Sequence, residues 1–441
     1  VHRLSPETKF NSGSGCDCLR YNALFSRGVD FDDRFASVDS TGMEESGWRP
    51  GAHEADSGSR RIVMDQRIAL SREMPETVDI RIATDSRFWK IADHYGRDLG
   101  GGFWGETNAE SKKMVLCHNF AFARNARQLG RIGPLAAAPE MLDEIREVID
   151  WGNDHVEILT GRGERIAPIA VWRGTVTLGF LRHQPVWEAC VVEQMLYENH
   201  LPFTIVLDGS LKSALEKTSV LILPGTACIS DAQAELITRF VEGGGRLLLL
   251  GQAGTRDERT RLRRRHAFEH LFGEAMPDLE FYGPPHWVPE LDLSALPDSL
   301  RSDYGRGKAA LVGRITPQAP PDLTRDFYSP FRKVAPKDIL PPGNEAEIMA
   351  ELAPLAGDCL RVTAPRWTLC EFWRHEAGTL VCLANLSLKR PGGPVTIELG
   401  PVQATAATVH AYPGGPAEEV AVSDGKVELP ALERFAAVVL K

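Results

Sequence analysis

The sequence predicts an α/β protein of more than one domain that ends in a small antiparallel β-domain. Its 441 residues are too many for a single ordinary core. Strand and helix patterns alternate from about residue 78, which argues for a parallel sheet. A second stretch, from about residue 165, holds uninterrupted apolar strands of the kind buried on both faces. From about residue 357 the chain consists of short strands separated by turn residues.

The first alternating stretch supplies three expected strands and two expected helices. Residues 1–60 are rich in Gly, Ser and Asp, and we expect long loops there. "VDIRIAT", "GGFWGE" and "MVLCHNFAF" are the expected strands, and "SRFWKIADHYGRD" has helical spacing. "PEMLDEIREVIDW" is an amphipathic helix with Pro139 at its start.

The second stretch repeats this alternation with longer apolar runs. "IAPIAVW", "FTIVL", "VLILP", "RLLLLG" and "KAALVGRI" are expected strands, and "PVWEACVVEQMLYENH" and "EAEIMAELAPLA" are expected helices. A capping box over residues 230–233 begins another helix, and the glycines at 243–245 end it. The tail strands include "LRVTAPRWTLCEFWRHEAGTLVCLANLS" and "FAAVVLK".

Cys228 follows the strand "VLILP" and precedes a helix, where a thiol can have a lowered pKa. Class I glutamine amidotransferases place their nucleophile in such a turn, with glycines two residues away on both sides and a His-x-Glu later in the chain. Here Thr226 and Ser230 occupy those two positions, and no later His is followed by Glu at the second position. The only His-x-Glu, His155 to Glu157, precedes the cysteine. We therefore expect Cys228 to be a small buried core residue.

Composition excludes several classes of partner. The formal net charge is -10, which argues against nucleic acid or an anionic membrane as the main partner. The basic run "RDERTRLRRRH" is the exception, and we interpret it as a solvated face. The eight cysteines form no Cys-x-x-Cys pair, so no metal and no cofactor are expected. No apolar stretch approaches the roughly 20 residues that span a bilayer, and no signal peptide is visible, so we expect a cytoplasmic protein. The chain starts with Val rather than Met.

The stretch "TSVLILPGTACISDAQAELITRFVEGGGRLLLLGQAG" resembles the amidotransferase-like middle domain of the family forty-two β-galactosidases and related glycoside hydrolases. "LRVTAPRWTLCEFWRHEAGTLVCLANLS" is similar to the start of the last domain of these proteins. The resemblance covers residues 165–441. It implies the C-terminal part of a (β/α)8 barrel over 1–160, a flavodoxin-like, amidotransferase-like domain without its triad over 165–356, and a β-domain over 357–441. It also implies a homo-oligomer, with a trimer as one form.

A complete barrel takes about 250 residues, so the first barrel strands are missing or degenerate, and we expect the chain to be truncated. Counting backward, "MVLCHNFAF" would be strand eight, "GGFWGE" strand seven and "VDIRIAT" strand six. Glu106 would then stand at the C-terminal tip of strand seven, where the resemblance places the nucleophilic glutamate. The alternative is a structural role, in which Glu106 accepts hydrogen bonds from the following turn.

A retaining glycosidase needs a second carboxylate as acid/base, about 5 Å from the first. In the family it follows Asn on strand four, but the only Asn-Glu pair here is Asn344-Glu345, far downstream. Glu44 and Glu45, in "STGMEESGW", are weak substitutes.

Five further residues could bind substrate. Trp104 and Trp89, like Trp48, could stack on sugar rings or simply pack. Asp85 and His118 could line the pocket or have hydrogen-bonded structural roles. Two functions stay open: a glycoside hydrolase that retains configuration, either active or an inactive fragment, and a non-catalytic assembly or sugar-binding protein with the same parts.

Overall fold

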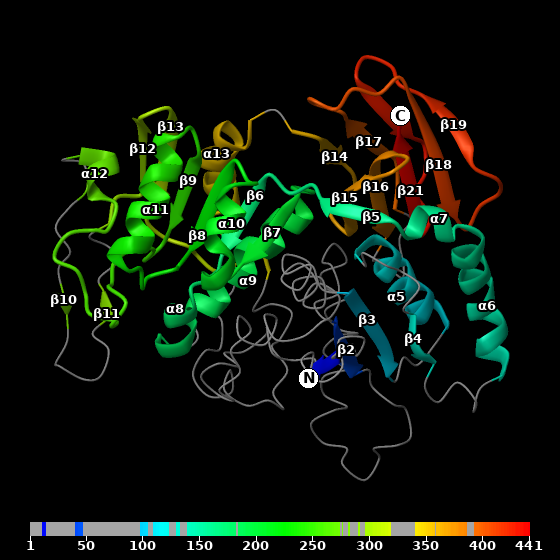
Figure 1. Cartoon of the computed structure of the whole chain (residues 1–441), viewed down its shortest axis with the longest axis horizontal. Helices are drawn as coiled ribbons and strands as arrows, with labels where there is room; N and C mark the ends of the chain where they lie inside the picture. Colours follow the sequence, from blue (N-terminus) through cyan, green and yellow to red (C-terminus); the bar gives the residue numbers. More distant parts are fainter. Residues whose placement is uncertain are drawn as a thin grey trace, which may run out of the picture.

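The computed structural model describes residues 11–14, 40–46, 98–104, 109–122, 129–132, 139–181, 184–273, 276, 281–282, 290–291, 296–318, 340–357, 359–385 and 392–441. Three β-structures organise these residues (Figure 1): a four-stranded parallel sheet near the N-terminus, a six-stranded sheet in the middle of the chain, and a C-terminal sandwich of two sheets. The expected strand "VDIRIAT" and the expected helix "SRFWKIADHYGRD" lie outside the described residues.

The N-terminal sheet holds four parallel strands in chain order: β1 (Asn11–Ser14), β2 (Ser40–Ser46), β3 (Asp98–Trp104) and β4 (Leu129–Ile132). Helix α5 (Ala109–Phe122) connects β3 to β4, and α6 (Pro139–Asp154) and α7 (Val156–Leu159) follow. Neighbouring parallel strands joined through a helix are the repeating unit of a (β/α) barrel. The expected strand in "GGFWGE" and the expected helix after residue 138 are confirmed.

The expectation that "MVLCHNFAF" is a strand was wrong, because these residues form most of α5. The helix packs against strands of the C-terminal sheet, and its side chains are buried on several sides, including Leu116, His118 and Phe122. A helix buried in this way has no polar stripe. Its apolar run therefore has the same pattern as a buried strand, and periodicity cannot separate the two.

The middle sheet has the order β12-β13-β9-β8-β6-β7. Its strands are β6 (Ile169–Trp172), β7 (Phe203–Val206), β8 (Val220–Pro224), β9 (Arg246–Leu250), β12 (Ser299–Tyr304) and β13 (Gly307–Val312). All pair in parallel except β12, which is antiparallel at one edge. The five parallel strands follow the order 2-1-3-4-5 of a doubly wound sheet. A two-stranded ribbon of β10 (Phe281–Tyr282) and β11 (Glu290–Leu291) precedes β12.

Helices cover both faces of this sheet. Apolar residues of α9 (Gln184–Glu198) and α13 (Glu345–Ala356) share one core with one face, and those of α10 (Leu211–Leu215), α11 (Asp231–Glu242) and α12 (Glu269–Phe272) share another core with the opposite face. A short 3-10 turn, η3 (Asp208–Ser210), and helix α8 (Thr175–Phe180) occupy connections between strands and helices. The predicted capping box is confirmed, since the Ser230 hydroxyl accepts from the Gln233 N–H and the Gln233 side chain accepts from the Ser230 N–H.

The C-terminal sandwich pairs a six-stranded sheet, β19-β18-β21-β16-β15-β5, with a three-stranded one, β14-β17-β20. The larger sheet contains β15 (Thr368–His375), β16 (Gly378–Asn385), β18 (Ala406–Tyr412), β19 (Glu418–Ala421) and β21 (Phe435–Leu440). The smaller contains β14 (Arg361–Thr363), β17 (Val395–Glu398) and β20 (Lys426–Leu429). The expected antiparallel tail is present. Its outermost strand, β5 (Arg162–Arg165), comes from a point in the chain before the middle sheet.

Candidate active site

The C-terminal edge of the parallel N-terminal sheet brings three of the candidate residues together. Strands β2 and β3 are paired so that Glu44 lies opposite Gly102, Glu45 opposite Phe103 and Ser46 opposite Trp104. Both strands end at this last pair. Positions 44, 102 and 104 therefore fall on one face of the sheet, and position 45 falls on the other.

Glu106 follows the end of β3 by two residues and lies outside the described residues, as do Asp85, Trp89 and Trp48. The backbone therefore places Glu44, Glu45 and Trp104 at one edge of adjacent parallel strands. This is the edge at which barrel active sites are built. Because neighbouring strands lie about 5 Å apart, residues at this edge can have the separation that a retaining pair of carboxylates needs.

His118 does not stand at a strand end. It lies within α5, is fully buried, and stacks on Phe122 with ring centroids 4.7 Å apart. The structure therefore favours a packing role for His118 over contact with a substrate.

The Asn344-Glu345 pair has structural contacts at the start of α13. The Glu345 carboxylate accepts a hydrogen bond from the Asn199 side chain at 2.6 Å and pairs with Arg366 at 2.6 Å. The Asn344 side chain bonds the backbone and hydroxyl of Thr316. The only Asn-Glu dipeptide of the sequence therefore joins α13 to its neighbours, outside the N-terminal sheet.

Cys228 is a core residue, as expected. Its side chain is 3% exposed, and burial raises the pKa of its thiol to about 11. Its backbone N–H donates to the Thr177 hydroxyl at 2.9 Å, and the neighbouring Thr226 hydroxyl donates to the Trp172 carbonyl oxygen at 2.8 Å. A thiol with this pKa is protonated at neutral pH and is a poor nucleophile.

Sequence analysis missed a second site, at the C-terminal edge of the middle sheet. Glu188, on α9, is 1% exposed, and its carboxylate lies beside two glycines that directly follow strands, Gly225 after β8 and Gly251 after β9. A Cβ at Gly225 would overlap Glu188 Oε2, and one at Gly251 would stand 3.5 Å from Oε1. Both glycines have φ of 61°.

The Glu188 carboxyl has one hydrogen bond, from the Gln184 amide to Oε1 at 3.0 Å, and Oε2 has no partner among the described residues. Burial raises the pKa of this carboxyl to about 7, although the bond from Gln184 acts in the opposite direction. A carboxyl group that keeps a proton well above the usual pH for a glutamate is therefore held against the turns after two central strands. The available signal was an acidic residue within a helix whose other positions are mostly apolar.

The turns after β8 and β9 begin alike, since Gly225 and Gly251 both have a positive φ directly after their strands. Gly251 adopts a positive φ directly after the strand, and its N–H bonds the Val312 carbonyl oxygen at 2.9 Å. A glycine at this position carries no nucleophile. Among the residues that the structure describes, no cluster of His, Cys, Asp or Glu is suited to a metal ion. No described helix is both long and apolar enough to cross a membrane.

No family model and no curated protein matches this sequence. Solved structures do match its fold. The catalytic mutant of a GH42 β-galactosidase from G. stearothermophilus aligns with 100% of this chain and 65% of its own, with a TM-score of 0.57 and 12% identity. The β-galactosidase from Rahnella sp. R3 aligns with 100% of this chain and 65% of its own, at a TM-score of 0.58 and 11% identity.

An exo-carrageenase of GH42 from Bacteroides ovatus aligns with 100% of this chain and 53% of its own, at a TM-score of 0.54 and 11% identity. The chain thus spans about two thirds or less of the length of these proteins. The likeness covers the parallel N-terminal sheet, the middle sheet and the C-terminal sandwich together. The chain therefore shares, along its whole length, the fold of the GH42 β-galactosidases.

Proposed function

We propose that this chain is part of a glycoside hydrolase that acts on a carbohydrate with retention of configuration. The observation that carries the proposal is the register of β2 and β3, which brings Glu44, Glu45 and Trp104 to the C-terminal edge of parallel strands in a fold shared with glycoside hydrolases. Glu106, two residues beyond β3, is the proposed nucleophile. The three domains are proposed to span 1–160, 165–356 and 357–441.

In the first step the Glu106 carboxylate would attack the anomeric carbon while the bond to the leaving oxygen breaks. An acid at the end of β2 would protonate that oxygen. In the second step the residue at the end of β2, now a base, would take a proton from water. The water would attack the anomeric carbon as the bond from that carbon to Glu106 breaks. Glu44 is a better candidate for this acid/base than Glu45. Position 44 lies on the same face of the sheet as Gly102 and Trp104, which precede Glu106 in the chain.

Trp104, Trp89 and Asp85 are proposed to bind the sugar. The similar solved structures are named for different sugars, one as a β-galactosidase and one as an exo-carrageenase. The sugar that this chain acts on is therefore to be identified by assay. The middle sheet is proposed to be an amidotransferase-like domain without chemistry, since Cys228 is buried and Gly251 carries no nucleophile. This domain would serve in packing or in self-association, as the resemblance implies.

The test is hydrolysis of a panel of 4-nitrophenyl glycosides by the chain and by Glu106→Gln. We expect turnover to fall by at least about a thousandfold in Glu106→Gln, with the melting temperature unchanged. Azide should restore turnover to Glu106→Ala, because a small anion can fill the place of the lost nucleophile. Glu147→Gln is the matched control, since Glu147 is an exposed carboxylate on α6. Turnover that persists in Glu106→Gln would place the nucleophile elsewhere.

The second candidate is a non-catalytic assembly or sugar-binding protein. It is favoured by the structural contacts of Glu345, which leave no Asn-Glu pair to act as acid/base in the described part of the chain. The two candidates separate in one experiment. A chain that binds sugar but turns over no glycoside of the panel, with Glu106→Gln binding equally well, supports the second.

A further inference from the structure

The basic run of the sequence forms an ordered hairpin whose outer side chains are solvated, as expected. Residues 256–265 contain six arginines, Asp257 and Glu258, so this segment carries a net charge of six minus two, or +4, in a chain of net charge -10. Arg256 pairs with Leu262 across the hairpin, and the Asp257 N–H bonds the Arg261 carbonyl oxygen at 2.9 Å. Thr260 turns the chain with a φ of 64°.

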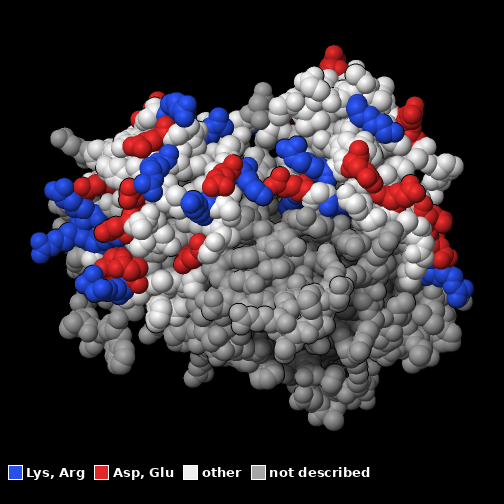
Figure 2. Space-filling model, viewed as in Figure 1, with Lys and Arg blue, Asp and Glu red and all other residues white. Residues whose placement is uncertain are grey.

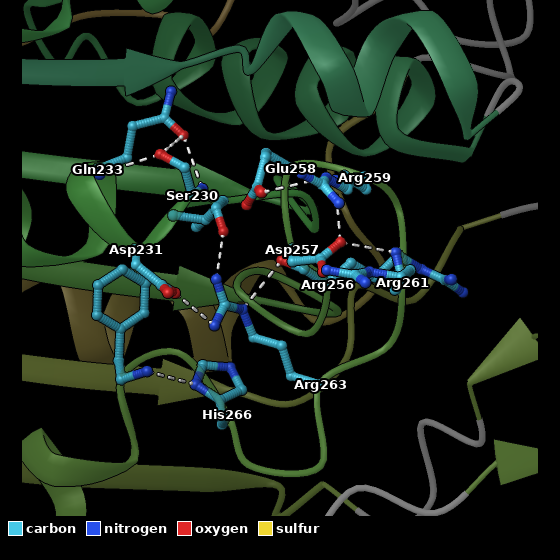
Figure 3. A network of polar contacts seen from close by, with 12 residues as sticks. Ser230, Asp231, Gln233, Arg256, Asp257, Glu258, Arg259, Arg261, Arg263 and His266 are labelled. Atoms are coloured by element: carbon cyan, nitrogen blue, oxygen red, sulfur yellow. Dashed lines mark hydrogen bonds and ion pairs between the residues drawn. The ribbon is translucent and has the colours of Figure 1, made fainter.

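The inner arginines fix this hairpin to the end of the middle sheet (Figure 3). Arg263 donates to the Ile229 carbonyl oxygen at 2.7 Å and pairs with Asp231 at 2.8 Å, at the start of α11. Arg256 is buried and donates to the Thr260 carbonyl oxygen at 3.0 Å. The buried His266 ring bonds the Ala253 carbonyl oxygen at 2.6 Å. The backbone of the hairpin is therefore tied at its base and across its strands.

The remaining arginines face solvent. The side chains of Arg259, Arg261 and Arg265 are 72%, 66% and 75% exposed, and Arg264 is also exposed. Asp257 pairs with Arg261 at 2.7 Å and Glu269 pairs with Arg265 at 3.1 Å, whereas Glu258 lies 3.9 Å from Arg259. Figure 2 shows Lys and Arg gathered at the left margin of the molecule, on the side where α11 and α12 lie. An ordered backbone thus presents several guanidinium groups together in water.

We propose that this hairpin, through Arg259, Arg264 and Arg265, binds an anionic polysaccharide by its sulfate groups. A guanidinium group offers paired N–H donors that match the oxygens of a sulfate, and an ordered backbone lowers the entropy lost on binding. The choice of a polysaccharide rests on the proposed carbohydrate function.

The test is the affinity of the chain for carrageenan, a sulfated galactan, measured by electrophoresis through gels that contain it. In Arg259→Ser/Arg264→Ser/Arg265→Ser we expect the dissociation constant to rise at least about tenfold at 0.1 M salt. The control is Lys217→Ser/Arg374→Ser/Lys426→Ser, which removes the same charge from exposed side chains outside the hairpin. Its affinity should stay within about twofold of the original.

Neutral galactan should retard neither protein, and double-stranded DNA should bind more weakly than carrageenan. The inference is overturned if both triple variants lose affinity equally, because the effect is then one of net charge. It is also overturned if neutral galactan binds as well, or if DNA binds more tightly. Glu106→Gln should bind carrageenan normally, so a failure of the proposed nucleophile and a failure of the hairpin give different results.

Discussion

Trp373 donates its indole N–H to the backbone carbonyl oxygen of Ala121 at 3.1 Å, although 252 positions separate the two residues. Arg162 donates to the same carbonyl at 3.2 Å, and Arg165 donates to that of Phe122 at 3.1 Å. These carbonyl groups end α5 and have no partner within the helix. Cations are also favoured at this end by the helix dipole. Side chains of β5 and β15 thus cap the helix that follows β3, and tie the candidate active-site sheet to the C-terminal sandwich.

We expect Arg165→Met to destabilise the protein strongly. Arg165 and Glu371 form a buried ion pair, and Arg165 also lies 4.1 Å from the centroid of the Trp373 ring. The substitution breaks this buried ion pair, so the free energy of unfolding should fall by about 3–5 kcal/mol. Urea denaturation measures this loss. In the control Arg374→Met, an exposed arginine on β15, the strand of Glu371, is removed, and the loss should stay below about 1 kcal/mol. Equal losses would contradict the role of the buried pair.

Gly225→Ala and Gly251→Ala form a matched pair of substitutions. Both glycines have φ of 61° and end neighbouring parallel strands, so both variants incur the same backbone strain, about 1–2 kcal/mol. Only at Gly225 does the new Cβ collide with the Glu188 carboxylate. We therefore expect Gly225→Ala to lose more stability than Gly251→Ala by at least about 2 kcal/mol in urea denaturation. Adding Glu188→Ala should recover part of the loss at Gly225 and none at Gly251.

Glu188 makes stability depend on pH. Its pKa in the folded chain, about 7, lies above the reference value of 4.5, so the native state keeps a proton that the unfolded state has lost. Stability therefore declines as pH rises from about 4.5 to about 7 and is level above that. In Glu188→Gln this contribution, on the order of 3 kcal/mol, should be absent when unfolding is measured at pH 5 and pH 8. Glu235→Gln, at an exposed carboxylate on α11, should keep the original pH profile. An unchanged profile in Glu188→Gln would show that the carboxyl is ionised when folded.

Cys228→Ala should lower the free energy of unfolding only slightly and should change no activity. The thiol is nearly fully buried and its pKa is about 11, so it contributes packing volume and not reactivity. We expect a loss on the order of 1 kcal/mol in urea denaturation. Iodoacetamide should modify Cys228 more slowly than Cys359, which is partly exposed, when both are followed by mass spectrometry. Glutamine hydrolysis by the original chain that disappears in Cys228→Ala would contradict this interpretation.

The sequence by itself determined the elements whose signals are local. "VLILP" and "RLLLLG" are apolar throughout because strands inside a doubly wound sheet are covered on both faces. The capping box formed by Ser230 and Gln233, three residues apart, predicts the start of α11. The glycines at 243–245 predict its end. The sequence also predicts that Cys228 is not a catalytic nucleophile, since the flanking glycines and the later His-x-Glu of the amidotransferases are absent. Each of these features depends on residues within one or two turns of chain.

Only the tertiary structure decided the features that depend on distant neighbours. α5 was mistaken for a strand because the C-terminal sheet buries it on several sides and removes its periodicity. β5 pairs with β15 at the edge of the C-terminal sheet. There Arg165 forms an ion pair with Glu371, and Arg162 and Arg165 donate hydrogen bonds to the last carbonyl groups of α5. The pKa of Glu188 depends on the turns at Gly225 and Gly251, which no helix pattern contains. Burial and electrostatics are properties of a three-dimensional neighbourhood, and the chain assembles each of these neighbourhoods from segments that are far apart in the sequence.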